Sequence, residues 1–280
     1  MVRLKFHLSL FFKEFLLFVL AMYLGVLSAY KIFTSGIVTI QPAKFNPNDL
    51  VILGIFVTIF FLIRKRKKFV SLTYKIFLAL IILVGSQIIF SAYVASPFDV
   101  MLPLVLLAVF YTYKNVLIHN IAIIMGIVGV AMVLGLSIAP KTGVILLVLL
   151  SFYDIISVYK TKHMVYMAKS MIESGAIFGF IVPSKMSDFL AGNNEARSKV
   201  GTEFMILGSG DIGLPLVMVC SLVQVSLSAS IITAIFSLLG LFVTHLIFIN
   251  QKERKPMAAL PPIATMTIIG YLIAIVTKNF

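Results

Sequence analysis

The sequence reads GVILLVLLSFYDIISVY at 143–159 and FMILGSGDIGLPLVMVC at 204–220, and each apolar stretch carries one acidic residue, Asp154 in the first and Asp211 in the second. Each stretch is apolar enough to form a membrane helix. A carboxylate at the centre of a bilayer costs at least ~2.5 kcal/mol on insertion scales, so it needs a functional or a pairing reason to be there. Only these two of the ten acidic residues fall well inside apolar stretches.

The composition indicates an all-α polytopic membrane protein. The 280 residues are 61% hydrophobic and 12% charged, with a mean hydropathy of +1.11, whereas a soluble domain is about 25% charged. The net charge of +13 fits cytoplasmic loops that face anionic lipid, and no nucleic-acid-binding fold is expected. The single cysteine, Cys220, excludes an internal disulfide and a zinc site built on cysteines. The four histidines lack a metal-binding spacing, so we expect neither a metal nor another cofactor.

The apolar runs predict nine membrane-spanning helices. Their expected bounds are 13–33, 49–63, 72–94, 100–113, 116–138, 142–160, 204–221, 226–249 and 258–277. If the N-terminus is cytoplasmic and the chain alternates, 19 of the 23 Lys and Arg residues fall on the cytoplasmic side. This bias is the positive-inside signal. It predicts a multi-pass integral protein of the cell membrane, with its N-terminus in the cytoplasm and its C-terminus outside.

A long polar segment divides the chain into three parts. These are an N-terminal six-helix part (1–160), a cytoplasmic loop (161–203) and a C-terminal three-helix part (204–280). Within the loop, the apolar island at 175–183 is too short to span a bilayer, and it could be a strand, a membrane-dipping segment or a capping loop. The stretch NNEARSK at 193–199 is typical of a flexible loop.

The two aspartates are predicted to lie at similar depth. Asp154 stands six residues before Lys160, and Asp211 stands eight residues after Glu203, each counted from the cytoplasmic end of its span. A helical rise of ~1.5 Å per residue converts these separations to ~9 Å and ~12 Å. Neither span carries a Lys or Arg at matching depth. The simplest mutual solution is two carboxyls that share one proton, as in aspartic proteolysis; a single buried aspartate could equally be explained by a structural hydrogen bond.

The residues before Asp211 favour an accessible backbone. Gly208, Ser209 and Gly210 complete a G-x-G-D sequence with it. Glycines permit the close approach of another backbone and permit non-helical conformations. Proteolysis inside a membrane demands both, because a substrate helix has to be unwound before its amide can be attacked.

Two further segments are candidates for shaping the site. Tyr153 immediately precedes Asp154, and Ala258-Ala259-Leu260-Pro261-Pro262 begins the last predicted span. The two prolines lack backbone donors, so we expect them to loosen the start of that helix and to leave free carbonyls near the site.

The set YD, then LGSGD, then AALP resembles the presenilin and signal peptide peptidase family of intramembrane aspartyl proteases over essentially the whole chain, in the form of a microbial (archaeal) presenilin homologue. The resemblance implies a presenilin-like horseshoe of nine helices and assigns the catalytic aspartates to Asp154 and Asp211. The family's third motif reads Pro-Ala-Leu. Here Ala258, Ala259 and Leu260 occupy it with the first proline replaced, while Pro261 agrees with the longer presenilin form.

The resemblance also implies substrates and partners. These are transmembrane helical proteins within membrane lipid, which would pair as a β-strand beside the GxGD segment. By analogy, 203–207 and part of 175–183 are candidates for that pairing. No obligate accessory subunit is expected, and a homo-oligomer is left open.

Two other classes compete with this reading. A proton-coupled transporter or channel would also use buried carboxylates and broken helices, but it would tend to show two related halves, and none is detectable. A prepilin-type peptidase also uses a GxGD aspartate, but its second aspartate lies in a cytoplasmic loop region, whereas Asp154 lies inside a predicted span.

Overall fold

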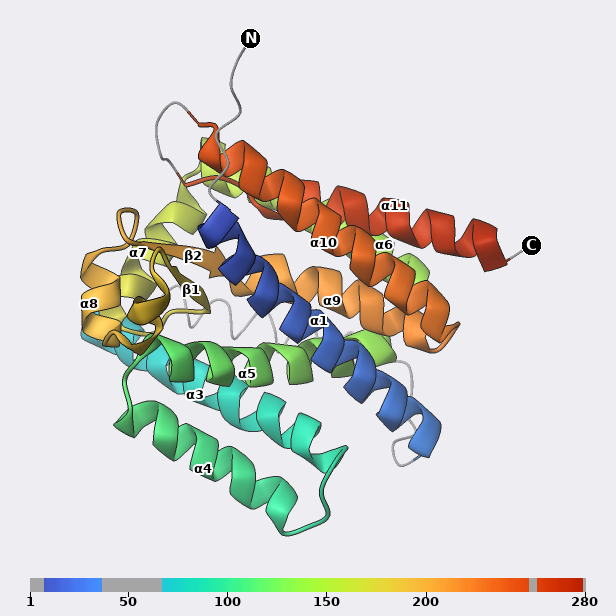
Figure 1. Cartoon of the computed structure of the whole chain (residues 1–280), viewed down its shortest axis with the longest axis horizontal. Helices are drawn as coiled ribbons and strands as arrows, with labels where there is room; N and C mark the ends of the chain where they lie inside the picture. The colour runs from blue at the N-terminus through green and yellow to red at the C-terminus, as the bar shows by residue number, and fades with distance from the viewer. Residues whose placement is uncertain (1–7, 37–66, 252–255, 279–280) are drawn as a thin grey trace.

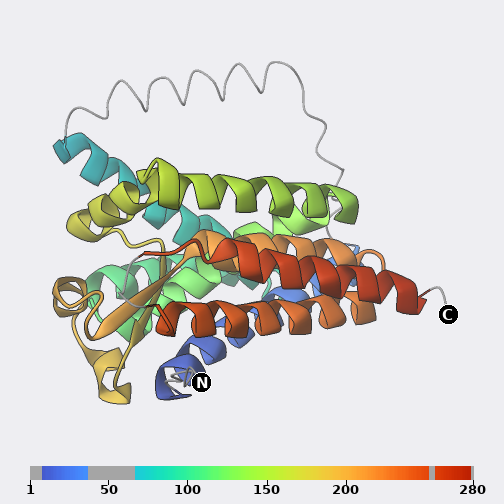
Figure 2. The ribbon, with the colours of Figure 1, turned by 90° about the horizontal axis from the view of Figure 1, so that it is seen from above.

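The computed structural model describes residues 8–36, 67–251 and 256–278. Within these ranges the protein is a bundle of long helices with short helices and two strands gathered at one end (Figures 1 and 2). Six helices contain a segment long and apolar enough to cross a membrane: α1 (Leu8–Ser35), α3 (Lys67–Ser91), α5 (Val116–Ser137), α6 (Pro140–Ile155, continued by a π-helical turn, Ile156–Lys160), α10 (Leu227–Ile249) and α11 (Leu260–Lys278).

Two shorter apolar helices accompany these six, α4 (Phe98–Thr112) and α9 (Ser209–Val223). The predicted span at 49–63 lies outside the described residues. The multi-pass character of the chain is therefore confirmed, while the number of nine helices stays a prediction.

Helix α5 lies at the centre of the described bundle and packs against α1, α3, α4 and α9. It is apolar on all sides, as expected for a core helix. Its contact with α3 is a backbone contact. A Cβ atom added at Gly85 would lie 2.0 Å from the Gly126 carbonyl oxygen, and one added at Gly129 would lie 1.9 Å from the Gly85 carbonyl oxygen. Small residues allow this close approach of membrane helices.

The segment between the two halves of the chain is ordered around a two-stranded antiparallel sheet. Strand β1 (Gly179–Pro183) pairs with β2 (Phe204–Gly208), in a register that runs from Gly179 opposite Gly208 to Pro183 opposite Phe204. Around the sheet lie α7 (His163–Ser174), a 3-10 turn (Met186–Leu190) and α8 (Asn193–Ser198). The expectation of an all-α protein is therefore wrong in this detail, and the island at 175–183 contains a strand.

The prediction of a flexible loop at 193–199 is also wrong, because Asn193–Ser198 forms α8. The helix is anchored by the buried Ala196, which packs with Val116 and Phe204. The Asn193 backbone N–H also donates to the Lys114 carbonyl at 2.7 Å. These tertiary contacts outweigh the polar local sequence.

Two predicted helix starts need correction. The seventh span was expected to begin at 204, but residues 204–208 form β2 and the helix begins at Ser209. The depth of Asp211 estimated from a helical rise starting at Glu203 is therefore invalid. The last helix begins at Leu260 rather than at 258. Its two prolines lie in the first turn, where a missing N–H costs nothing, so they start the helix rather than loosen it.

Candidate active site

Asp154 lies at the end of α6, one residue before Ile155, where the helix passes into its π-helical turn. The residue is 7% exposed. The backbone N–H of Leu260 is directed at its carboxyl group. The Oδ2 atom is buried and has no hydrogen-bond partner among the described residues. The carboxyl group thus lies beside the start of α11, and its Oδ2 atom still has a hydrogen-bonding position to fill.

Asp211 lies in the first turn of α9, immediately after β2. The Gly208 backbone N–H is directed at its carboxyl group, and the charge of Asp154 acts on it across the interior. Helix α9 packs on both α6 and α11, through a cluster that includes Leu147, Met218 and Leu260. The structure therefore brings the two aspartates of the sequence analysis together where α6, α9 and α11 meet.

The segment that precedes α11 forms one wall of this site. Ala258 and Leu260 are buried, at 5% and 3% exposed, and Ala259 and Pro261 are partly buried. The Thr244 hydroxyl on α10 donates to the Ala259 carbonyl at 3.4 Å. Residues 258–259 are outside the helix, so the chain presents backbone at this wall.

The residues beside the aspartates differ in their surroundings. A Cβ atom at Gly208 would lie 3.1 Å from Asp211 Oδ2, whereas one at Gly210 would meet nothing within 4 Å. The Ser209 backbone N–H donates to the Phe178 carbonyl at 3.1 Å, which joins the start of α9 to the sheet. Tyr153 is 51% exposed. Gly208 thus touches the site, Gly210 borders open space, and Tyr153 lies away from the buried side of α6.

Helix α5 closes the outer edge of β1 with two buried side chains. The Asn120 amide accepts a hydrogen bond from the Ile181 N–H at 2.8 Å and donates one to the Ile181 carbonyl at 2.8 Å. The His119 Nε2 atom lies 3.1 Å from the Gly179 carbonyl oxygen. Because Ile181 directs its N–H and carbonyl away from β2, Ile181 and Ile206 are a non-hydrogen-bonded pair of the sheet. Ile206 therefore directs its own N–H and carbonyl to the outer edge of β2. No other described residue hydrogen-bonds these two groups of Ile206.

A buried polar group near the site was missed by the sequence analysis. Glu14 on α1 and His245 on α10 are paired, with 2.7 Å between Oε2 and Nδ1. Next to it, Lys13 is 2% exposed and its ammonium group donates to the carbonyls of Pro183, at 3.0 Å, and of Ser184. Counting Lys13 as a cytoplasmic topology residue missed this contact. A Lys-Glu pair just inside the first apolar run was the available signal.

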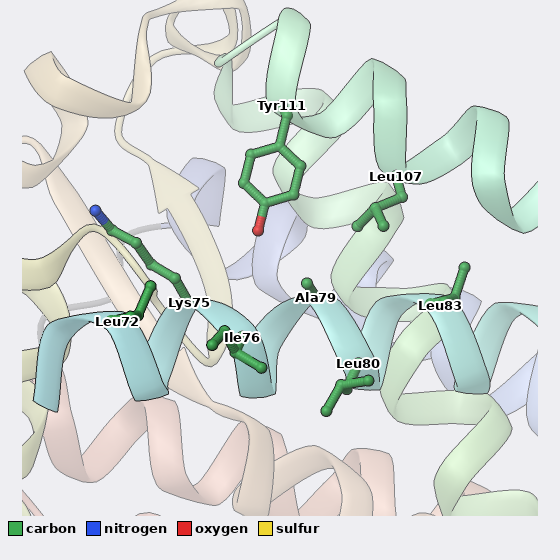
Figure 3. A pocket seen from close by; sticks show the side chains of 8 residues that line it. All are labelled: Leu72, Lys75, Ile76, Ala79, Leu80, Leu83, Leu107 and Tyr111. Carbon is green, nitrogen blue, oxygen red and sulfur yellow. The ribbon is translucent and has the colours of Figure 1, made fainter. Parts of the chain in front are cut away.

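Helices α3 and α4 form a groove of about 310 Å³ that does not belong to this site. Figure 3 shows its lining: Leu72, Lys75, Ile76, Ala79, Leu80, Leu83, Leu107 and Tyr111. Only Lys75 and Tyr111 have polar ends, and neither aspartate is present. The groove offers apolar surface and no pair of acids or bases, so the chemistry is located elsewhere.

Comparisons with known proteins identify the family and the fold of the chain. Residues 15–280 match the family model described as signal-peptide peptidase, presenilin aspartyl protease. No curated protein is significantly similar to the chain in sequence. Two solved structures of a presenilin family intramembrane aspartate protease, in the C222 and P2 space groups, are similar to it at a TM-score of 0.58, with 21% and 22% identity. Each match covers 94% of this chain, together with 95% of the first solved chain and 96% of the second. The similarity shows a shared fold.

Proposed function

The chain belongs to the signal-peptide peptidase, presenilin aspartyl protease family, and from this premise we propose that it hydrolyses peptide bonds within transmembrane segments, with Asp154 and Asp211 as its catalytic dyad. One observation carries the proposal: Asp154 at the end of α6 and Asp211 in the first turn of α9 lie where these two helices pack on each other and on α11, and the Asp154 charge influences Asp211. A structural hydrogen bond would explain one such residue, but it does not explain two acidic side chains at the same helix junction.

The chemistry follows from two carboxyls that share one proton. The ionised carboxyl takes a proton from water, whose oxygen attacks the scissile carbonyl carbon. The protonated carboxyl donates to the carbonyl oxygen, so a tetrahedral diol forms. Transfer of a proton to the amide nitrogen then breaks the C–N bond and leaves a carboxylic acid and an amine. The surroundings of Asp154 support this scheme, because the Leu260 N–H is directed at its carboxyl group and Oδ2 has no partner among the described residues.

The substrate would bind as an added strand on β2. The edge of β1 is occupied by Asn120 and His119, whereas Ile206 directs its N–H and carbonyl outward. An unwound substrate can pair with such an edge through main-chain hydrogen bonds. Because β2 leads directly into α9, a strand bound there would reach the start of the helix that carries Asp211. The open space around Gly210 suits this approach.

The charge bias supports the orientation within the membrane. With the N-terminus in the cytoplasm, both aspartates lie in the half of the bilayer nearer to the cytoplasm. A chiral site accepts a peptide in one direction, and the presenilin-like arrangement suits substrates whose N-terminus is outside. Cleavage of two reporter substrates that differ only in membrane orientation tests this. Preference for the reporter with its N-terminus inside would show that the proposed orientation is wrong.

Purified protein in detergent, incubated with a transmembrane peptide, tests the activity itself. Asp154→Asn and Asp211→Asn should each abolish cleavage, because asparagine keeps the volume but cannot share the proton. Asp99→Asn, in the first turn of α4, is the matched control and should cleave normally. A hydroxyl-containing mimic of the transition state should inhibit the wild type.

The outcomes separate the competing functions. Substantial cleavage by a folded Asp154→Asn or Asp211→Asn protein would show that the two aspartates are not the catalytic dyad. Cleavage restricted to bonds outside the apolar segment would favour a prepilin-type peptidase. Ion or solute flux through reconstituted protein without cleavage would favour transport.

A further inference from the structure

The Glu14–His245 pair is a buried ionisable group that the proposed reaction does not use. The Glu14 side chain is 3% exposed and the His245 side chain is 0% exposed. The Phe11 ring lies 5.0 Å from the imidazole ring, centroid to centroid. Burying two ionisable groups carries a desolvation penalty that often exceeds their attraction. An ionisable pair inside a membrane bundle therefore calls for a role beyond stability.

The neighbours of the pair contact two elements next to the candidate active site, the sheet at its Pro183 end and the segment 258–260. Lys13, beside Glu14 on α1, binds the carbonyls at the end of β1. Thr244, beside His245 on α10, donates to the Gly240 carbonyl of its own helix at 2.9 Å and also lies 3.4 Å from the Ala259 carbonyl oxygen, one residue before the N–H that is directed at Asp154. A bond between α1 and α10 thus ties the sheet to the segment 258–260.

The pair also reaches the dyad electrostatically. Among the described residues, Asp154 and Glu14 are the acidic groups that influence Asp211. The other ionisable groups on the elements packed against α1 and α10 are His119 on α5, Cys220 on α9, and Tyr271 and Lys278 on α11; β1 has none. His119 is already engaged by the Gly179 carbonyl. Glu14 is therefore the described acidic residue outside the dyad that influences Asp211.

We propose that Glu14 and His245 form a positioning pair for the peptidase reaction, which keeps the sheet and the segment 258–260 in place around the dyad. The inference rests on the proposed function. Neither residue touches the scissile bond. Both act through Asp211 and through the walls of the site.

Glu14→Gln tests the electrostatic part, since it keeps the volume and a hydrogen bond to His245 but removes the charge. With this acidic group removed, the pH–activity profile should differ from that of the wild type, because Glu14 is an ionisable group that influences Asp211. The kcat should fall about tenfold, with KM within about twofold of the wild type, because geometry at the dyad is disturbed rather than substrate binding. Ser230→Ala is the matched control. It removes a buried bond from α10 to the Val219 carbonyl on α9, and its pH profile should equal that of the wild type.

A charge swap tests the positioning part and does not depend on one variant. His245→Glu places two carboxyls together and should lose activity, while Glu14→His with His245→Glu restores an acid–base pair and should recover about tenfold or more of that loss. A folded Glu14→Gln protein with the wild-type pH profile would overturn the inference, as would a folded swap without recovery. If the wild type cleaves no substrate, the proposed function fails instead. The electrostatic coupling is then tested separately, by comparing the pH dependence of hydroxyl-mimic binding between the Glu14→Gln variant and the wild type.

Discussion

Replacing Asn120 with leucine tests whether α5 holds the sheet in the form that a substrate would bind. Asn120 is fully buried and makes two hydrogen bonds of 2.8 Å to Ile181, which is 1% exposed. Leucine has a similar volume but leaves a buried N–H and a buried carbonyl without partners. Each orphaned group costs about 1–3 kcal/mol, so the variant should lose about 2–6 kcal/mol where the sheet meets α5. We expect a lower unfolding temperature and a KM raised about tenfold or more, since 1.4 kcal/mol in binding corresponds to tenfold.

The assay compares kcat and KM for a transmembrane peptide with thermal unfolding in the same detergent. Ser86→Ala is the matched control, because Ser86 is equally buried but bonds only to carbonyls of its own helix, at Ile82 and Leu83. It should cost less than about 1 kcal/mol and leave KM unchanged. If Asn120→Leu lowers kcat at constant KM, the sheet is not the substrate platform. If both the unfolding temperature and KM equal those of the wild type, the two hydrogen bonds do not hold β1.

Three further substitutions test the surroundings of the site. Gly208→Ala should reduce kcat about tenfold or more, because its Cβ would lie 3.1 Å from Asp211 Oδ2 and displace the carboxyl group. In Gly210→Ala the added Cβ meets nothing within 4 Å in the free protein, so this variant should fold normally and raise KM instead. Equal effects of the two substitutions on kcat would contradict this distinction. Lys13→Met should lower the unfolding temperature by removing two contacts to the end of β1, and an unchanged unfolding temperature would show that those contacts add nothing. Hydrogen bonds that Lys199 donates to two flanking glutamates raise its pKa, so its contribution to stability is present below the ordinary lysine pKa and is lost only as the pH rises through the raised value. The group is fully exposed, so Lys199→Met should leave activity and stability at neutral pH unchanged; a large loss would show that the ion pairs anchor β2.

The sequence was sufficient for the class of protein, and it singled out the two aspartates as candidates for the site. An acidic residue in an apolar run is costly anywhere in a bilayer, so Asp154 and Asp211 stand out without a structure. Helices α5 and α10 lie within a residue of their predicted bounds, because long apolar runs leave few alternatives. The family resemblance drawn from YD, LGSGD and AALP is confirmed.

The sheet and the polar ties between helices could not be derived in the same way. Residues 204–208 are as apolar as a helix start, and they become a strand because Gly179–Pro183 pairs with them across the loop. Local periodicity does not contain that contact. Glu14 and His245 are 231 positions apart in the chain, so only the packing of α1 on α10 makes them partners. Asn120 similarly looks like a stray polar residue in an apolar helix until β1 is placed beside it.

The glycine contact between α3 and α5 has a mechanical consequence. Because backbone touches backbone there, no side chain can rotate to let the two helices slide, and they must travel as one block. Helices α10 and α11 form a second block, since a Cβ atom at Gly240 would lie 2.6 Å from the Ile263 Cα. Between α6 and α9, by contrast, the close neighbour of Gly143 is the flexible thioether of Met218. Of these three contacts, the one between α6 and α9 is the most easily deformed. Under the proposed function, a widening there that admits a substrate would also change the separation of the two acids.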